Sequence, residues 1–281
     1  MDASSPPRAE YPLAQAPEDI RRLIDRVSRR NVGTREVLRR AGLAPGMRVL
    51  DTGSGPGDVA LMAAELVGPT GAVLGIDRDP ASLEVARARA AATGLDHVEF
   101  RAGDVQDAAA LGLTSGFDAV VGRLVLMYCR DPVATLRGLV GFARSGAVVA
   151  FEEIDFAVVG WAMHPPGPLF ERANGWRREA FARTGIHSAM GFQLHATFLA
   201  AGLPAPTLQL NTLIGAGSEW DDYETNAGVI ASLLPKLVEH GIATAEEVGV
   251  ETLTARLRDE AVALGATVAA PPLIGAWTRK P

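Results

Sequence analysis

The ten residues at positions 49–58, VLDTGSGPGD, are the clearest candidates for a chemical function in this chain. An expected strand ends in the carboxylate Asp51, and an expected helix begins at Val59. Glycine adopts positive φ and leaves bare backbone for a ligand, so the turn between these elements predicts a binding site. A dinucleotide-binding fingerprint needs glycine or alanine at position 58, but this chain has Asp58 there. The carboxylate of Asp58 would repel a pyrophosphate at the start of the helix. Together with Asp51, it instead suits a ligand that carries an ammonium group. The turn contains three alternating glycines, Gly53, Gly55 and Gly57.

Two further carboxylates follow the next two expected strands. Asp77 lies 20 residues past Gly57, where doubly wound nucleotide sites hydrogen-bond ribose hydroxyls; an ion pair with Arg78 is the alternative. Asp104 ends the third strand, where its carboxylate can accept from an adenine amino group and the N–H of Val105 can donate to the ring. Acidic strand ends in this order favour a ligand that contains a nucleoside.

Strands and helices alternate around these residues. The expected strands are 47–50, 72–76, 98–101, 118–121 and 147–151, and the helices between them are 59–67, 81–92 and 132–143. Such alternation predicts a parallel sheet with right-handed crossovers. We therefore predict one doubly wound α/β domain at 45–281, preceded by an N-terminal helical lid at 1–44. Helical insertions at about 157–190 and 217–268 follow the fifth and sixth strands, where such folds carry substrate-binding loops.

Four runs in this order resemble the motifs of the class I S-adenosylmethionine-dependent methyltransferases: VLDTGSGPGDVA, GIDRDPASLEVAR, FRAGDVQD and FDAVVGRLVLMYCRDP. The resemblance covers roughly residues 45–155 and is closest to the small-molecule branch related to quinone-ring C-methyltransferases and natural-product methyltransferases. It implies a Rossmann-like, doubly wound seven-stranded sheet with a reversed last strand, which Leu273–Arg279 supplies. It also implies S-adenosylmethionine as cofactor and S-adenosylhomocysteine as product.

The resemblance assigns roles to residues of this chain. Asp51 and Gly53 approach the methionyl end of the cofactor, Asp77 holds the ribose, and Asp104 with Val105 holds the adenine. Arg123 and Leu124, at the end of the fourth strand, lie beneath the sulfonium. The complete set expected to bind the cofactor is Asp51, Gly53, Gly55, Gly57, Asp77, Arg78, Asp104, Val105 and Arg123.

The expected function is methyl transfer to a small aromatic or apolar metabolite, with carbon or oxygen favoured as the methylated atom. Because the methyl group of a sulfonium is already activated, the protein mainly aligns the reactants and excludes water. A general base helps when the acceptor loses a proton. Two alternatives stay open: a non-methylating reaction such as cyclisation on the same fold, and an NAD(P)-dependent oxidoreductase, which Asp58 and the Asp104 motif oppose.

Three residues are candidates for the general base. Glu152 directly follows the fifth strand and is the first choice, since Glu153 points to the opposite side of that strand. His164 and His187 lie in the first insertion and are the next candidates.

Aromatic residues of the insertions are expected to wall the acceptor pocket, although some of them will instead hold the insertions onto the core. An arginine-rich helix at 18–30 is expected to close over the cofactor with Tyr11, and Arg21 or Arg22 to pair with the methionine carboxylate. The candidate walls are Trp161, Phe170, Trp176, Phe181, Trp220 and Tyr223.

Composition limits the other function classes. A net charge of −6 argues against a nucleic-acid partner, and Cys129, the only cysteine, excludes an intrachain disulfide and a cysteine-built zinc site. The chain shows no secretory leader pattern and no apolar run of the ~18 residues that a membrane helix needs, so we expect a cytoplasmic protein without a membrane partner. No metal is expected, because Asp131 stands alone near the fourth strand and suits a helix start. A homodimer is compatible with the sequence.

Overall fold

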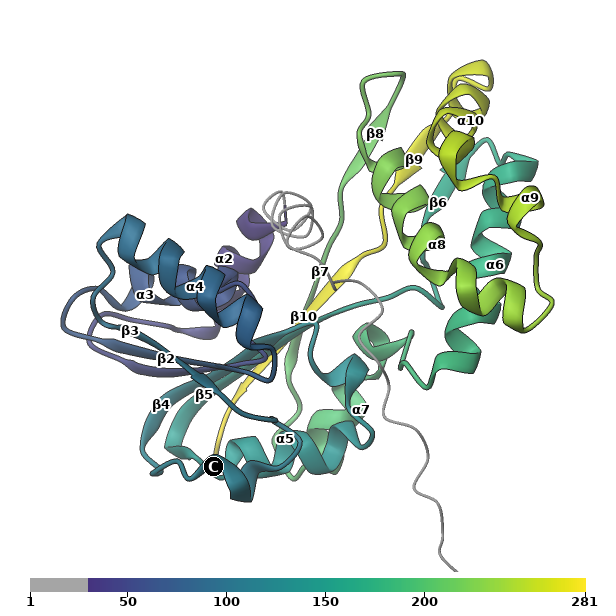
Figure 1. Cartoon of the computed structure of the whole chain (residues 1–281). Coiled ribbons are helices and arrows are strands. Elements are labelled where there is room, and N and C mark those ends of the chain that lie inside the picture. The colour runs from purple at the N-terminus through teal and green to yellow at the C-terminus, as the bar shows by residue number, and fades with distance from the viewer. Residues whose placement is uncertain (1–29) are drawn as a thin grey trace, which may run out of the picture.

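The computed structural model describes residues 30–281 of the chain, and a twisted mixed sheet forms its centre (Figure 1). Within this part of the chain, seven strands form the main sheet in the order β3-β2-β1-β4-β5-β10-β7. The strands are β1 (Arg48–Thr52), β2 (Ala72–Asp77), β3 (Val98–Ala102), β4 (Phe117–Arg123), β5 (Ala143–Ile154), β7 (Thr207–Asn211) and β10 (Leu273–Arg279).

The direction of the strands confirms the predicted Rossmann-like fold. Strands β1 to β5 pair in parallel, whereas β10 runs antiparallel to both β5 and β7. The chain order reverses between β1 and β4, and ligands of open α/β sheets bind outside the carboxyl ends of the strands at such a point.

Helices cover both faces of the sheet. Helices α2 (Asn31–Ala41), α3 (Asp58–Val67) and α4 (Pro80–Thr93) lie on one face, and α5 (Pro132–Val140) and α7 (Met190–Ala200) lie on the other (Figure 1). Two short 3-10 helices, η1 (Ala108–Leu111) and η2 (Leu126–Tyr128), follow β3 and β4. Consecutive strand residues, such as Val49 and Leu50, pack into different hydrophobic clusters, because successive side chains of a strand point to opposite faces.

Short polar side chains begin two of the crossover helices. Asp79 accepts hydrogen bonds from the N–H groups of Ala81 and Ser82 at the start of α4. Asp131 accepts from the N–H of Ala134 at the start of α5, as its position before a proline predicts. These caps fix where each helix leaves the carboxyl edge of the sheet.

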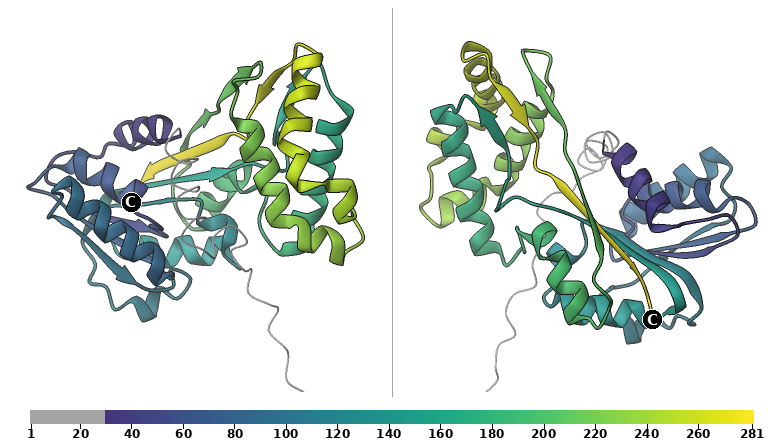
Figure 2. Two further views of the ribbon diagram at one scale, coloured as in Figure 1. Left: turned by 45° about the horizontal axis from the view of Figure 1, so that its top comes forward. Right: turned by 180° about the vertical axis from the view of Figure 1, so that it is seen from behind.

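The two insertions form one unit beside the sheet, which we call the cap, residues 156–187 and 213–271 (Figure 2). Helices α6 and α10 both pack against α8. The three-stranded antiparallel sheet of the cap was not predicted, because its short strands come from segments that lie far apart in the sequence. The cap elements are β6 (Ala162–His164), α6 (Pro168–Thr184), β8 (Ile214–Ala216), α8 (Asp222–Glu239), α9 (Ala245–Val248), α10 (Val250–Ala263) and β9 (Thr267–Ala269), with the sheet order β6-β9-β8.

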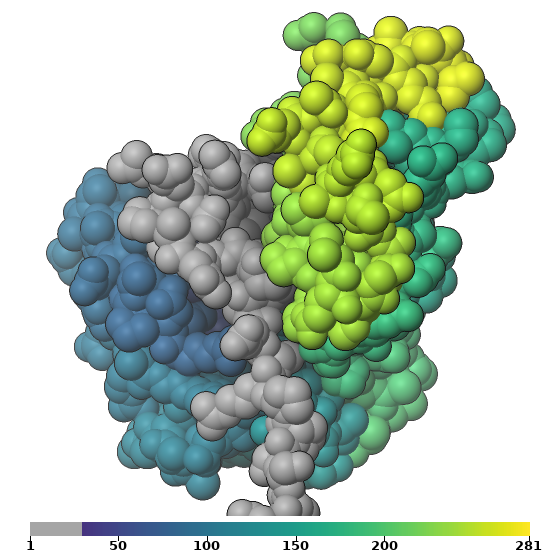
Figure 3. Space-filling view, turned by 45° about the vertical axis from the view of Figure 1, so that its right-hand side comes forward, coloured from purple at the N-terminus to yellow at the C-terminus, as the bar shows by residue number. Residues whose placement is uncertain are grey.

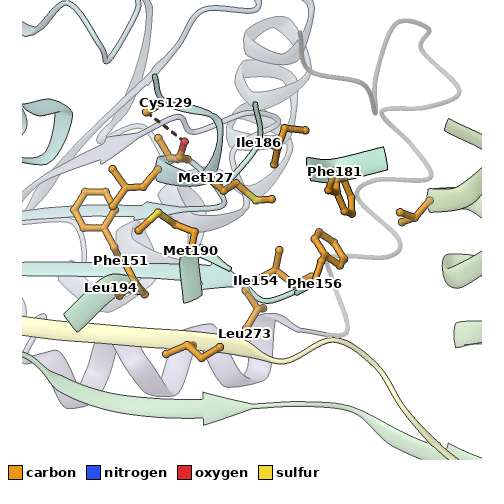
Figure 4. Close-up of a cluster of buried hydrophobic side chains, with 14 of the residues drawn as sticks. Met127, Cys129, Phe151, Ile154, Phe156, Phe181, Ile186, Met190, Leu194 and Leu273 are labelled. Carbon is orange, nitrogen blue, oxygen red and sulfur yellow. Dashed lines mark hydrogen bonds between the residues drawn. The ribbon is translucent and has the colours of Figure 1, made fainter. Parts of the chain in front are cut away.

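A continuous hydrophobic cluster joins the cap to the core (Figure 4). Phe156 stacks on Phe181 with ring centroids 4.9 Å apart, and Phe151 meets Phe198 edge to face. In the space-filling view the cap, green to yellow, rises beside the blue core (Figure 3). No helix within residues 30–281 is long and apolar enough to cross a bilayer.

Candidate functional site

The glycine-rich turn joins β1 to α3 with left-handed backbone at Gly53, Gly55 and Gly57, whose φ angles are 65°, 50° and 91°. A Cβ atom on Gly53 would lie 2.4 Å from Val125, and one on Gly57 would lie 3.1 Å from Ala86. No atom lies within 4 Å of the corresponding position on Gly55. The outer glycines therefore allow close packing, and the middle one leaves an open surface for a ligand.

A cavity of about 220 Å³ lies against this turn at the carboxyl ends of β1 to β4. Its position at the switch point of the sheet is where the fold places a nucleotide. Asp51 and Gly57 do not line it, since Asp51 is buried behind the turn and Gly57 packs against α4. The other residues predicted to bind the cofactor all line it: Gly53, Gly55, Asp77, Arg78, Asp104, Val105 and Arg123.

Asp77 is held rigidly at the edge of the cavity. Its Oδ2 accepts from the N–H of Gly55 at 2.8 Å, and its Oδ1 accepts from the N–H of Asp79 at 2.9 Å. Burial raises the pKa of the Asp77 carboxyl, and these two N–H groups act in the opposite direction. Each carboxylate oxygen keeps acceptor capacity for a hydroxyl group of a ligand.

A cluster of charged side chains lies beneath the turn. Asp58 pairs with Arg89 at 2.9 Å, so it is not the free partner for an ammonium group that the sequence predicted. Asp51 is 1% exposed, and its carboxylate oxygens have no hydrogen-bond partner in the described chain. Burial raises the pKa of Asp51 well above its usual value, against the lowering effect of Arg123. A buried carboxylate is costly, and the positive charge of Arg123 offsets part of that cost.

Arg123 connects this cluster to α2. Its Nη1 donates to Asn31 Oδ1 and to Thr34 Oγ1, both at 2.9 Å, while its Nη2 lies 3.8 Å from Asp58. Burial lowers the pKa of the guanidinium, and Asp58 and Glu152 oppose that shift. The backbone of Leu124, the next residue, has φ of 57°, which turns the chain sharply along the cavity wall.

The neighbouring acids Glu152 and Glu153 face opposite sides of β5. Glu152 is 3% exposed, and neither of its carboxylate oxygens has a hydrogen-bond partner among the described residues. Glu153 accepts from the N–H groups of Val125 at 3.0 Å and Leu126 at 2.7 Å. Burial raises the pKa of Glu152 and raises that of Glu153 to about 8.

Residues 43–173 match the family described as a methyltransferase domain. These residues of the chain are a methyltransferase domain of the class I S-adenosylmethionine-dependent type. Over 147 residues it is 34% identical to aklanonic acid methyltransferase DauC of Streptomyces sp. strain C5, covering 49% of this chain and 66% of that protein. Over 117 residues it is 36% identical to an arsenite methyltransferase of Aquipseudomonas alcaligenes, covering 40% and 34%. The matches thus span about one third to two thirds of these relatives.

Solved structures of the family share the fold. A putative methyltransferase from Bacillus halodurans C-125 superposes with a TM-score of 0.58 at 18% identity, over 88% of this chain and 97% of that one. The cofactor of this methyltransferase family is S-adenosylmethionine, as the motifs implied. The residues that line the cavity fit this group: the open side of Gly55 leaves room for it, and the oxygens of Asp77 keep acceptor capacity for hydroxyl groups.

The two histidines that the sequence proposed as bases lie elsewhere. His164 is exposed on β6 of the cap, where it pairs with Thr267. His187 is half-buried, and its Nε2 lies 3.1 Å from the carbonyl oxygen of Cys129, while its N–H donates to the carbonyl of Met127. His187 is thus held by the loop after β4 and does not line the cavity.

The aromatic residues proposed as pocket walls pack inside the cap and do not line the cavity. Trp161 is 3% exposed, stacks on Phe156 and donates from Nε1 to Asp222 at 2.6 Å. Trp220 covers Gly215, and Tyr11 lies outside the described residues, as do Arg21 and Arg22. The remaining members of the set are buried in the same hydrophobic cluster: Phe170, Trp176, Phe181 and Tyr223.

The bonds by which Glu153 holds the loop after β4 were not predicted, because they depend on the pairing of β4 with β5, for which the local sequence carries no signal. Tyr128 and Cys129 also line the cavity, and burial raises the pKa of the Cys129 thiol to about 12, so this thiol is no nucleophile at neutral pH. No group of three or more potential metal ligands occurs within residues 30–281.

Proposed function

We propose that this methyltransferase transfers the methyl group of S-adenosylmethionine to an oxygen or carbon atom of a small molecule. The observation that carries the proposal is Glu152, a buried carboxylate that does not itself line the cavity but pairs in register with Arg123, which does. A carboxylate in this position suits an acceptor that must lose a proton, such as a hydroxyl group or an activated carbon.

The chain's own residues supply orientation and a proton acceptor. Asp77 and Asp104 hold the nucleoside, and the cofactor supplies an activated methyl group. The carboxylate of Glu152 accepts the acceptor's proton, and Arg123 stabilises the charge of the carboxylate cluster. DauC, whose name gives aklanonic acid as its substrate, supports a small-molecule acceptor.

Calorimetry tests the cofactor part of the proposal. The full chain should bind S-adenosylmethionine and S-adenosylhomocysteine saturably and should not bind NAD or NADP. Turnover with the true acceptor should release one S-adenosylhomocysteine per product. A product formed without consumption of the cofactor would instead favour a cyclase, and nicotinamide binding would favour an oxidoreductase.

A further inference from the structure

One edge of the molecule carries no charged side chain. Residues 184–218 contain no Asp, Glu, Lys or Arg, although charged residues make up 21% of the chain, and this segment forms α7, β7 and β8. Within residues 30–281, β7 is an edge strand of the main sheet and β8 is an edge strand of the cap sheet. An edge strand presents unpaired backbone N–H and C=O groups, which proteins usually protect with charged side chains. This edge lacks that protection.

Apolar side chains lie exposed on one face of β7. Leu208 is 48% exposed and Leu210 is 52% exposed. They pair in register with Ala276 and Ile274 of β10, which belong to the core cluster on the α7 face of the sheet. Residues that are directly opposite each other point to the same face. The two leucines therefore continue the apolar face of the sheet to its edge, where half of each side chain remains in contact with water.

The other face of β7 is polar and is attached to α2. Gln209 Oε1 accepts from Arg40 Nη1 at 2.8 Å, and Gln209 Nε2 donates to Asn211 Oδ1 at 2.9 Å. A partner strand at this edge must therefore be apolar on one face and carry neutral polar groups on the other. β7 itself has this pattern, and an acidic or basic strand would find no opposite charge on it.

The sequence of β7, TLQLN, is also symmetric about its central residue. If two identical strands pair antiparallel with Gln209 on the two-fold axis, Leu208 of each copy lies opposite Leu210 of the other. An axis at Leu208 would place Leu210 opposite Pro206, and an axis at Leu210 would place Leu208 opposite Thr212. The central register therefore pairs every leucine with a leucine, which a strand of unrelated sequence would not require.

We propose that two copies of this chain pair through β7 in antiparallel orientation, with Gln209 on the two-fold axis. The main sheets of both copies then form one continuous sheet, and the outward backbone groups of β7 are hydrogen-bonded. The leucines of both copies bury one another on the α7 face. Because β7 runs toward the cap, antiparallel pairing directs the two caps to opposite ends of the dimer. This inference does not depend on which methyl acceptor the protein uses.

Sedimentation velocity of the full chain at a series of protein concentrations tests the dimer. The double variant Leu208→Glu with Leu210→Glu places like charges directly opposite each other and removes the apolar contact, so dimerisation should weaken about a hundredfold or more. The matched control is Val238→Glu with Val262→Glu, at valines of α8 and α10 that are 51% and 45% exposed. This control should dimerise like wild type, and all three proteins should bind S-adenosylhomocysteine alike.

A disulfide tests the register and does not rely on the glutamate variant. The natural Cys129 is buried, so an introduced cysteine on β7 is the thiol available to an oxidant. In Gln209→Cys the two introduced residues face each other across the axis with Cα atoms about 4.5–5.5 Å apart, within the reach of a disulfide. In Thr207→Cys, on the same face, they lie about 13 Å apart along the strands. Oxidation should therefore yield a covalent dimer in Gln209→Cys and little in Thr207→Cys.

Each contrary result is distinct. A wild type that stays monomeric at every concentration would overturn the inference, whether the edge is free or covered by another segment. A dimer that survives the two glutamates would lie on another surface. Equal cross-linking of Gln209→Cys and Thr207→Cys would exclude the pairing about Gln209.

Discussion

Asp77 shows how a single residue joins the glycine-rich turn to the wall of the cavity. Its two oxygens accept from the N–H groups of Gly55 and Asp79, so the carboxylate cannot rotate away from the cavity that it lines. A ribose bound by charge-assisted hydrogen bonds to such a rigid acceptor gains affinity, because little conformational freedom is lost on binding.

Asp77→Ala should therefore weaken binding of S-adenosylhomocysteine by about 2–4 kcal/mol, since it removes the acceptor for the ribose. Asp104→Ala should cost less, because the backbone of Val105 still lines the cavity. Calorimetry on folded variants measures both, with the exposed Asp96→Ala as control. Wild-type affinity in Asp77→Ala would show that the ribose lies elsewhere.

The raised pKa of Glu152 predicts a specific dependence of turnover on pH. A carboxyl group that is protonated cannot accept a proton, so kcat should fall as pH falls through the raised pKa of Glu152. An ordinary glutamate has a pKa of about 4.3, so the fall in kcat should occur at a pH above that value. Glu152→Gln should abolish turnover but still bind S-adenosylhomocysteine. A variant with full activity would place the base elsewhere.

Asp51, Asp77 and Asp104 were predicted as site residues because each one ends an expected strand and belongs to a local motif. The positions of Asp77 and Asp104 at the cavity need no information beyond their own neighbours in sequence, whereas Asp51 of the same set is buried behind the turn. The contact of Glu153 with the loop after β4 differs, because it depends on the pairing of β4 with β5. The same limit explains Asp58, whose partner Arg89 comes from the next helix.

At the scale of elements, two contacts hold the loop from Leu124 to Cys129 that forms one wall of the cavity. Glu153 binds the loop from the sheet side through the N–H groups that begin η2. His187 binds it from the cap side through the carbonyl groups of Met127 and Cys129. The position of the cavity wall thus depends on the cap.

Glu153 should make stability depend on pH. Its pKa of about 8 in the folded chain lies above the ordinary value, so the folded state binds the proton more tightly than the unfolded state. The resulting stabilisation is complete below the ordinary pKa, about 4.3, and is lost as pH rises toward 8. Thermal unfolding between pH 5 and 8 should show this loss in wild type and a flatter profile in Glu153→Gln. Parallel profiles would contradict the assignment.

His187→Ala should weaken binding of S-adenosylhomocysteine although His187 does not line the cavity. Loss of one hydrogen bond to the loop, worth about 1 kcal/mol, predicts a change of about fivefold. His187→Gln, which keeps a donor, should recover part of the affinity. His195→Ala is the matched control, because His195 is exposed on α7. Equal affinity in His187→Ala and His195→Ala would show that the loop is held without the cap.

At the scale of the whole molecule, the fold of the core could be predicted but that of the cap could not. In the core, strands and helices alternate along the sequence, and this local alternation predicts a doubly wound sheet. The cap sheet joins β6, β9 and β8, and more than 100 residues of sequence separate β6 from β9. The aromatic residues that suggested a pocket in sequence instead fill the interior of this cap.

A buried polar network holds the cap together. Arg177 of α6 is 2% exposed, donates to Asn226 of α8 and to Asn174, and lies 4.1 Å over the ring of Trp161. Asp222 accepts from Trp161 and opposes the charge of Arg177. The network therefore connects the two insertions to the segment that leaves β5 beside Glu152.

Arg177→Leu should destabilise the protein by about 3–5 kcal/mol, because it removes one charge of a buried pair with Asp222 together with the hydrogen bonds to Asn226 and Asn174. The double variant Arg177→Leu with Asp222→Asn should recover part of this loss, since it removes the second charge of the pair as well. Thermal unfolding measures both, and Arg178→Leu, at an exposed neighbouring position, is the control. If the cap only covers the core, S-adenosylhomocysteine affinity will stay unchanged in Arg177→Leu at temperatures where it is folded. If the cap positions the cavity wall through His187, affinity will fall in parallel with His187→Ala.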